Sequence, residues 1–197
     1  ELSSVQPVAS AMRWIGMTGI GLFALTLVGA TVTGSGASWA CSSWPLCEGW
    51  VVWPGDLLGR VHMLHRLVAL GVGLALAWLT ARLATWRGIS RGIFGWVLAA
   101  FVLYLIQIGL GAINLWMGFP ALLNALHLGL ATAIWAAIGI AWAWALGEAQ
   151  WVEGIPGETV RLRNLWEPYF TLTKPGIVAL LLVTTAGAMM IAQGGLP

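Results

Sequence analysis

Polar and charged residues along this chain gather in short segments that separate long apolar blocks. A helix needs about 20 consecutive, mostly apolar residues to cross a bilayer. Blocks free of Asp, Glu, Lys and Arg occupy residues 14–32, 67–81, 92–117, 121–146 and 175–196. The second block reaches spanning length only if its helix begins near Leu57. The pattern therefore predicts an all-α membrane protein with a four-helix transmembrane bundle and a fifth transmembrane helix.

The composition supports a membrane protein and excludes several other classes. Of the 197 residues, 59% are hydrophobic and 8% are charged, and the mean hydropathy is +0.87. Soluble domains carry about 25% charged residues, so a soluble domain, a disordered tail and a nucleic-acid-binding protein are excluded. The net charge of +2 gives no reason to expect an anionic partner. The expected surroundings are the lipid bilayer of a bacterial or archaeal cell membrane.

Basic residues predict the orientation of the helices, because cytoplasmic loops are enriched in Lys and Arg. Most of them flank one set of helix ends: Arg13, Arg82, Arg87, Arg91, Arg161, Arg163 and Lys174. We therefore expect a cytoplasmic N-terminus and an outward-facing loop over residues 33–56, which contains no Lys or Arg. Arg60 and Arg66 are the exceptions, and both fall at the outer end of the second helix.

Segment 148–173 is the most polar part of the chain and contains four of the seven acidic residues. We interpret it as a cytoplasmic linker. It would separate a first domain, residues 1–147, from residues 174–197, which would form the first transmembrane helix of an incomplete second domain.

A short internal repeat relates the two halves of the first domain. In one half, Gly29 precedes a loop and then His65; in the other, Gly111 precedes a loop and then His127. Each half is thus a helix running outward, a loop, and a helix running inward with a histidine near its start. Parallel repeats of this kind are related by an axis along the membrane normal, which places the two histidines at matching depth.

His65 and His127 are the leading candidates for chemistry, because an ionisable residue inside a membrane is functional by default. Two imidazoles at one depth on facing helices can ligate the iron of one haem from both sides. Arg66 could then neutralise a haem propionate near the outer interface. The alternative is that the two histidines only form hydrogen bonds between helices. Room beside these helices is expected at three glycines: Gly71, Gly73 and Gly129.

His62 lies three residues before His65, on the same helical face and one turn nearer the outside. It is a candidate catalytic residue, an acid or base beside the haem, or a ligand in exchange with His65. The alternative is an interfacial histidine that contacts the loop or lipid headgroups. In the third helix, Gln107 and Asn114 are interpreted as residues that form interhelical hydrogen bonds.

Cys41 and Cys47 flank Ser-Ser-Trp-Pro-Leu in the outward-facing loop, where an oxidising compartment permits a disulfide. One interpretation is a structural staple, worth about 2 kcal/mol on the chain-entropy model. The other is a redox-active pair that relays thiol chemistry. The tryptophans of this loop are expected to anchor it in the interface: Trp39, Trp44, Trp50 and Trp53.

Four motifs resemble the haem A synthase family in order and spacing: Thr33-Gly-Ser-Gly36, Cys41-Ser-Ser-Trp-Pro-Leu-Cys47, His65-Arg66 and Asn124-Ala-Leu-His127. The resemblance extends over about residues 15–146. It implies a four-helix unit in which His65 and His127 ligate haem iron and Cys41 and Cys47 form a disulfide. The haem would be b-type, or haem O as substrate and haem A as product, because this family oxidises a methyl group of haem O to the formyl group of haem A.

Two features depart from the usual family pattern. A typical member contains two four-helix halves, so a homodimer or another chain would have to supply the second half. Many members carry Glu three residues before the first histidine, where this chain has His62.

Residues 168–197 resemble another family, the protohaem IX farnesyltransferases or haem O synthases. The similar motif is Tyr169-Phe-Thr-Leu-Thr-Lys174-Pro175-Gly-Ile-Val. The Asp-rich sites of that family, for magnesium and prenyl diphosphate, lie further along and are not in this sequence. We therefore expect no farnesyl transfer by the chain as given.

The sequence predicts a haem A synthase-type oxidoreductase, active in haem A biosynthesis and cytochrome oxidase assembly and fused to the start of a haem O synthase. One alternative is a non-catalytic bis-His module that hands haem to the fused transferase, and His62 favours it. Another is an electron-transfer haem subunit of a larger membrane complex.

Overall fold

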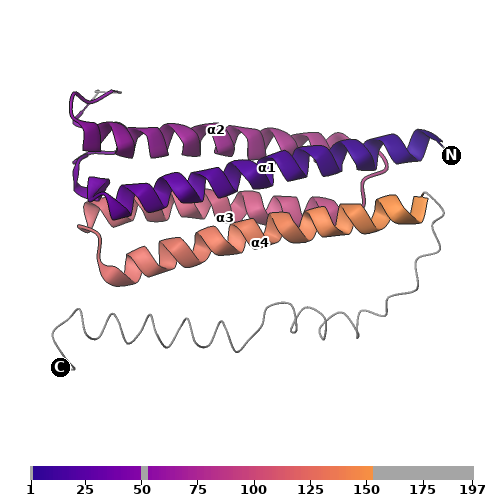
Figure 1. Ribbon diagram of the computed structural model, residues 1–197. Coiled ribbons are helices and arrows are strands. Elements are labelled where there is room, and N and C mark those ends of the chain that lie inside the picture. Colours follow the sequence, from indigo (N-terminus) through magenta and orange to yellow (C-terminus); the bar gives the residue numbers. More distant parts are fainter. Residues whose placement is uncertain (1, 50–52, 153–197) are drawn as a thin grey trace. The chain divides into compact units, whose positions relative to one another are not determined.

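The computed structural model describes residues 2–49 and 53–152. Their regular structure is helical: α1 (Leu2–Gly34), the 3₁₀ turn η1 (Ala37–Trp39), α2 (Leu57–Thr85), α3 (Arg91–Trp116) and α4 (Ala121–Val152) (Figure 1). Four of these helices are long and apolar enough to cross a membrane. The predicted all-α membrane fold is confirmed for these residues. The fifth expected helix and most of the expected linker lie outside them, and α4 continues through residues 148–152 of that linker.

Local sequence signals explain where the helices begin. The side chains of Asp56 and Ser90 each accept a hydrogen bond from the backbone N–H three residues further on, at 2.7 and 3.3 Å. Such caps satisfy N–H groups that the first turn of a helix leaves unpaired. Between α3 and α4 the chain reverses through Gly118 and Phe119, whose φ angles are 72° and 57°.

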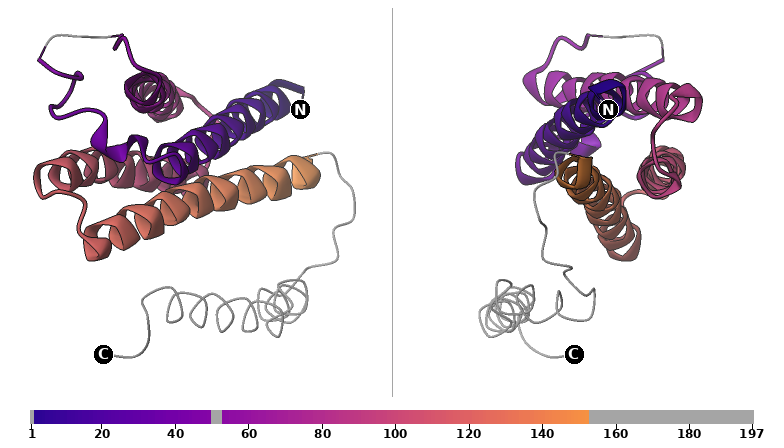
Figure 2. Two further views of the ribbon diagram at one scale, coloured as in Figure 1. Left: turned by 60° about the vertical axis from the view of Figure 1, so that its left-hand side comes forward. Right: turned by 90° about the vertical axis from the view of Figure 1, so that its right-hand side faces the viewer.

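The four helices form a bundle in chain order. Helix α1 packs against α2 and α4, and α3 packs against the same two helices. Helices α2 and α4 therefore stand at opposite corners, as the end-on view in Figure 2 shows. The centre is filled by fully buried apolar side chains, among them Ile15, Leu76, Leu79, Ile93, Val97 and Ile134.

Tyr104 fastens α3 to α2. Its hydroxyl donates a 2.6 Å hydrogen bond to the carbonyl of Ala69, and its ring lies so close to Gly73 that a Cβ there would be 2.9 Å from Cε1. The expectation that Gly73 leaves room for a flat ligand is therefore wrong, because the tyrosine ring fills that space. Gly71 and Gly129 do face open space.

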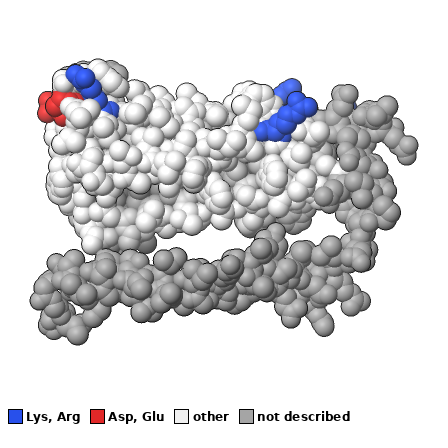
Figure 3. Space-filling model, viewed as in Figure 1, with Lys and Arg blue, Asp and Glu red and all other residues white. Residues whose placement is uncertain are grey.

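Charge is distributed as in a membrane protein. On the face seen in Figure 3, charged side chains lie at the two ends of the described bundle and an uncharged band separates them. One end carries the loop between α1 and α2, and the other carries the loop between α2 and α3. The uncharged band fits the hydrocarbon core of a bilayer.

Candidate functional site

The loop between α1 and α2 is closed by a disulfide. Cys41 and Cys47 are bonded with a Cα–Cα distance of 4.7 Å, which confirms the expected pairing. Both residues are 1% exposed and pack against Met63 of α2. Because thiol–disulfide exchange requires access to a sulfur, this burial favours the structural staple over the redox-active pair.

Two arginines of α2 hold this loop in place. Arg66 donates from Nη1 to the carbonyl oxygens of Ser43 and Pro45, at 2.7 and 3.1 Å. Arg60 binds the carbonyl oxygens of Pro54 and Gly55, at 3.0 and 2.7 Å. These are the two arginines that depart from the distribution of positive charge along the chain. Their backbone contacts give a structural reason for cations at this end of the bundle.

His62 is part of the same attachment. It is 7% exposed, with Nδ1 3.0 Å from the carbonyl oxygen of Ala37 and Nε2 3.2 Å from Nη2 of Arg66. Arginine can only donate, so Nε2 accepts and Nδ1 carries the proton that it donates to Ala37. Both ring nitrogens of His62 are therefore engaged.

The position that corresponds to His62 in the second half is occupied by Asn124. Its amide Nδ2 donates to the carbonyl of Phe119 at 3.1 Å. In both halves, then, the residue three before the histidine binds a carbonyl in the loop that precedes its own helix. The internal repeat thus holds at the level of hydrogen bonding.

His65 and His127 each lie against a glycine of the preceding helix. A Cβ on Gly29 would be 3.1 Å from Cε1 of His65, and a Cβ on Gly111 would be 3.3 Å from Cε1 of His127. The sequence identified both glycines as repeat markers but not as contacts of the histidines. Their matching place in the internal repeat, each on the helix that precedes its histidine, was the signal that could have shown it.

The rings of these two histidines have no hydrogen-bond partner in the described part of the chain. Nδ1 of His65 and Nδ1 of His127 are buried and unpartnered, and within the described residues only His62 uses its ring in hydrogen bonding. The two rings come from α2 and α4, which stand at opposite corners of the bundle. Side-chain hydrogen bonds between helices, the alternative role for this pair, are not what holds these rings.

Gln107 makes the interhelical hydrogen bond that the sequence predicted. Its Nε2 donates to the backbone carbonyl of His127 at 2.9 Å, which ties α3 to α4 at the histidine itself. Its Oε1 is buried without a partner, and so is Oδ1 of Asn114, which makes no interhelical side-chain bond among the described residues.

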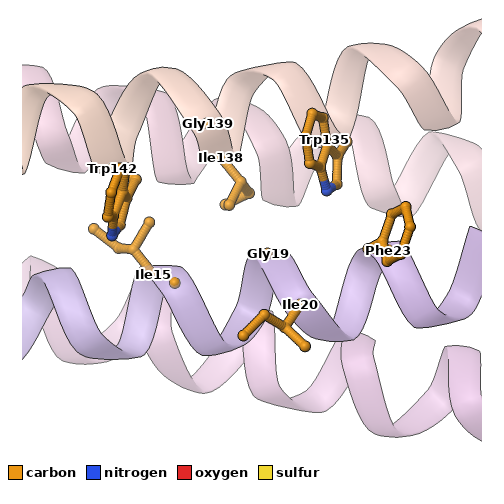
Figure 4. Close-up of a pocket in the computed structure, with 9 residues that line it drawn as sticks. Ile15, Gly19, Ile20, Phe23, Trp135, Ile138, Gly139 and Trp142 are labelled. Carbon is orange, nitrogen blue, oxygen red and sulfur yellow. The ribbon is translucent and has the colours of Figure 1, made fainter.

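An apolar groove of about 470 Å³ lies between α1 and α4, away from the histidines (Figure 4). Among its α1 residues, Phe23 is the nearest in sequence to Gly29, on which His65 is seated. Six positions separate them, about 9 Å along the helix. Among the described residues, no ionisable side chain lines it. The groove is bordered by Ile15, Gly16, Gly19, Ile20, Phe23, Trp135, Ile138, Gly139 and Trp142.

Residues 5–139 match the family described as COX15-CtaA, cytochrome oxidase assembly protein. The chain belongs to the COX15-CtaA family. The matched residues include the disulfide, the two glycine–histidine pairs and the arginines that hold the loop. The site described above therefore lies within the family domain.

Several curated relatives of this COX15-CtaA chain carry the name protoheme IX farnesyltransferase. One from Halobacterium salinarum is 31% identical over 92% of this chain and 42% of its own length. One from Haloarcula marismortui is 33% identical over 91% of the chain and 43% of the relative. A Thermus thermophilus relative is 35% identical over 73% of the chain and 24% of its own length. The chain thus spans less than half the length of these relatives.

Proposed function

We propose that this COX15-CtaA family chain binds haem between α2 and α4, with His65 and His127 as the two iron ligands. The observation that carries the proposal is the symmetric pair of imidazoles, each seated on a glycine and each without a hydrogen-bond partner. A buried polar atom left unpaired costs about 1–3 kcal/mol. Neutral imidazole is a good haem ligand, so a ligand explains why two such rings are kept inside an apolar bundle.

The outer loop would cover the haem on its outward side. Arg66 and His62 hold the loop on α2. Trp39 and Phe119 hold it on the turn before α4, with ring centroids 5.0 Å apart. Nε of Arg66 has no hydrogen-bond partner among the described residues, so Arg66 keeps a donor for a haem carboxylate.

We infer that the reaction is the oxidation of a haem O methyl group to the formyl of haem A, which serves cytochrome oxidase assembly. Family membership and the motif resemblance support it. Bound haem would supply iron-centred redox chemistry, while the protein orients the macrocycle. Nε2 of His62 accepts from Arg66. To take up a proton during the reaction, Nε2 would first have to lose this hydrogen bond, so any movement of His62 would be linked to a movement of Arg66.

Further parts of the proposal concern the rest of the protein. Relatives named protoheme IX farnesyltransferase align over about nine-tenths of this chain, which supports a fused transferase segment after the bundle. A homodimer or another chain would supply a second four-helix half. The disulfide loop would face outward and the loop with Arg87 the cytoplasm, following the distribution of positive charge.

A non-catalytic haem-binding module or electron-transfer subunit is the alternative. The hydrogen bonds of His62 favour it, because a general base needs a free lone pair and both ring nitrogens are engaged. Formyl haem in the extracted pigment supports the enzyme. Unmodified haem that only cycles between redox states supports the alternative.

The test of haem binding is the pigment of the full chain purified from membranes, identified by mass and visible spectrum. The wild type should show six-coordinate low-spin haem. His65→Ala and His127→Ala should each abolish that spectrum, whereas the control Leu64→Ala, on the exposed face of α2, should keep it. An unchanged low-spin spectrum in both histidine variants would refute the proposal.

A further inference from the structure

The two halves of the bundle surround their histidines differently. On α3, Gln107 lies four residues before Gly111 and Asn114 lies three residues after it. At about 100° per residue both fall within about 60° of Gly111 around the helix, so they share the face on which His127 is seated. The corresponding positions on α1, around Gly29, are occupied by Leu25 and Val32. The α3 face on which His127 is seated thus carries two amides, where the α1 face on which His65 is seated carries two apolar residues.

Both amides contain a buried oxygen that lacks a partner among the described residues. These atoms are Oε1 of Gln107 and Oδ1 of Asn114, and Asn114 is only 4% exposed. Gln107 is fixed beside His127, because its Nε2 donates to the backbone carbonyl of that residue at 2.9 Å. Native proteins leave few buried polar atoms unsatisfied, so each such atom requires a reason.

His127 offers the complementary group. Its Nδ1 is buried and unpartnered and would lie 3.9 Å from a Cβ on Gly111, on the face that carries the two amides. When an imidazole binds iron through Nε2, its Nδ1 carries the proton and needs an acceptor. The region around Gly111 therefore contains one donor that needs an acceptor, on His127, and two amide oxygens that need donors.

We propose that Gln107 and Asn114 accept the Nδ1 proton of His127, directly or through one buried water, and thereby position this ligand and raise its basicity. His65 receives no such help from the corresponding positions of α1, which are Leu25 and Val32. The inference rests on the proposed function, since it takes His127 as an iron ligand. Gln107 and Asn114 are positioning residues, because they act on the haem only through His127.

The physical consequence is a lowered reduction potential. A ligand whose Nδ1–H is donated to an acceptor becomes more basic, and hydrogen bonding behind the axial ligand is one of the means by which a protein tunes haem iron. A more basic ligand stabilises the ferric form. Removing the acceptors should therefore raise the midpoint potential while leaving the haem bound.

The experiment exchanges the amides for the residues of the other half. Gln107→Leu, Asn114→Val and the double variant are purified as full chains with their haem. A redox titration and the electron paramagnetic resonance spectrum of the ferric form are then recorded. We expect haem retained, an upward shift of the midpoint potential that is largest in the double variant, and altered g-values. The reverse change, Val32→Asn, gives His65 an amide neighbour and should shift the midpoint potential downward.

Thr80→Val is the matched control. Thr80 is a buried polar residue, 8% exposed, but its hydroxyl binds the carbonyl of Leu76 in its own helix, so its loss should leave the potential unchanged. A double variant that binds haem with unchanged potential and g-values overturns the inference while the proposed function stands. If the amide variants fail to fold, Val32→Asn is the deciding variant. The inference is then overturned if the midpoint potential of Val32→Asn does not fall. Absence of haem from the wild type instead overturns the proposed function.

Discussion

Nε2 of His62 lies 3.2 Å from Nη2 of Arg66, one turn further along α2. With their other nitrogens the two side chains bind three carbonyl groups of the loop between α1 and α2. His62 binds that of Ala37, and Arg66 binds those of Ser43 and Pro45. The same loop carries the disulfide. This end of the bundle is therefore held by a side-chain network that begins three residues before a candidate haem ligand.

Arg66→Ala should loosen this loop without unfolding the helices. Hydrogen bonds to charged groups are worth about 1.5–3 kcal/mol, so amide exchange in residues 40–49 should accelerate at least about tenfold. Hydrogen exchange followed by mass spectrometry measures this. Arg82→Ala, at the other end of α2, is the control and should leave the loop unchanged. Equal exchange in the two variants would show that Arg66 does not hold the loop.

Substitutions at His62 should separate its two hydrogen bonds. His62→Gln can still donate to Ala37 and accept from Arg66, so we expect haem content and loop protection close to the wild type. His62→Glu can accept from Arg66 but, when ionised, cannot donate, so the Ala37 carbonyl loses its partner. It should bind haem, loosen the turn at η1, and move any oxidation activity towards the family pattern. Loss of haem from His62→Ala but not from His65→Ala would mean that the ligand had been assigned wrongly.

Gly29→Ala and Gly111→Ala should disturb the haem through the histidines. The added methyl group would meet Cε1 of His65 at 3.1 Å or Cε1 of His127 at 3.3 Å, so each ring must move by a few tenths of an ångström. We expect a changed ferric g-tensor and weaker haem retention, measured after extended dialysis against a haem acceptor. Matched controls are Gly34→Ala on α1 and Gly109→Ala on α3, where the new methyl group meets no atom within 4 Å. If all four variants gave the same spectrum, the contact of the two histidine rings with Gly29 and Gly111 would be contradicted.

The disulfide should be both stabilising and located outside the cytoplasm. A Cys41→Ser, Cys47→Ser double variant opens a short loop, which should lower stability by about 2 kcal/mol on the chain-entropy model. Thermal unfolding in detergent, with and without reductant, measures this. In sealed right-side-out vesicles, a membrane-impermeant maleimide should label the cysteines only after reduction. Labelling confined to inverted vesicles would reverse the proposed topology.

Some features of the protein followed from the sequence alone because they depend on short-range patterns. The apolar blocks predicted four spanning helices, since the bilayer thickness sets the length of an apolar span. Helices α2 and α3 lie close to the predicted bounds, whereas α1 begins at Leu2, well before residue 14, and α4 continues to Val152. A Cys41–Cys47 disulfide was permitted by a loop without Lys or Arg and implied by the family resemblance, and the structure contains it. Gln107 and Asn114 were both interpreted as residues that form interhelical hydrogen bonds. Gln107 forms one, whereas the side chain of Asn114 forms none among the described residues.

Tertiary structure alone decided which side chains contact one another across the bundle. Gly73 was expected to leave space, but Tyr104 of the neighbouring helix fills it. Gly29 and Gly111, which looked like repeat markers, are the surfaces on which His65 and His127 rest. Apolar side chains surround a transmembrane helix on every side, so hydropathy specifies that it spans the bilayer but not its rotation about its own axis. That rotation is fixed only when the helices pack closely, because packing turns the glycines towards the neighbouring helices.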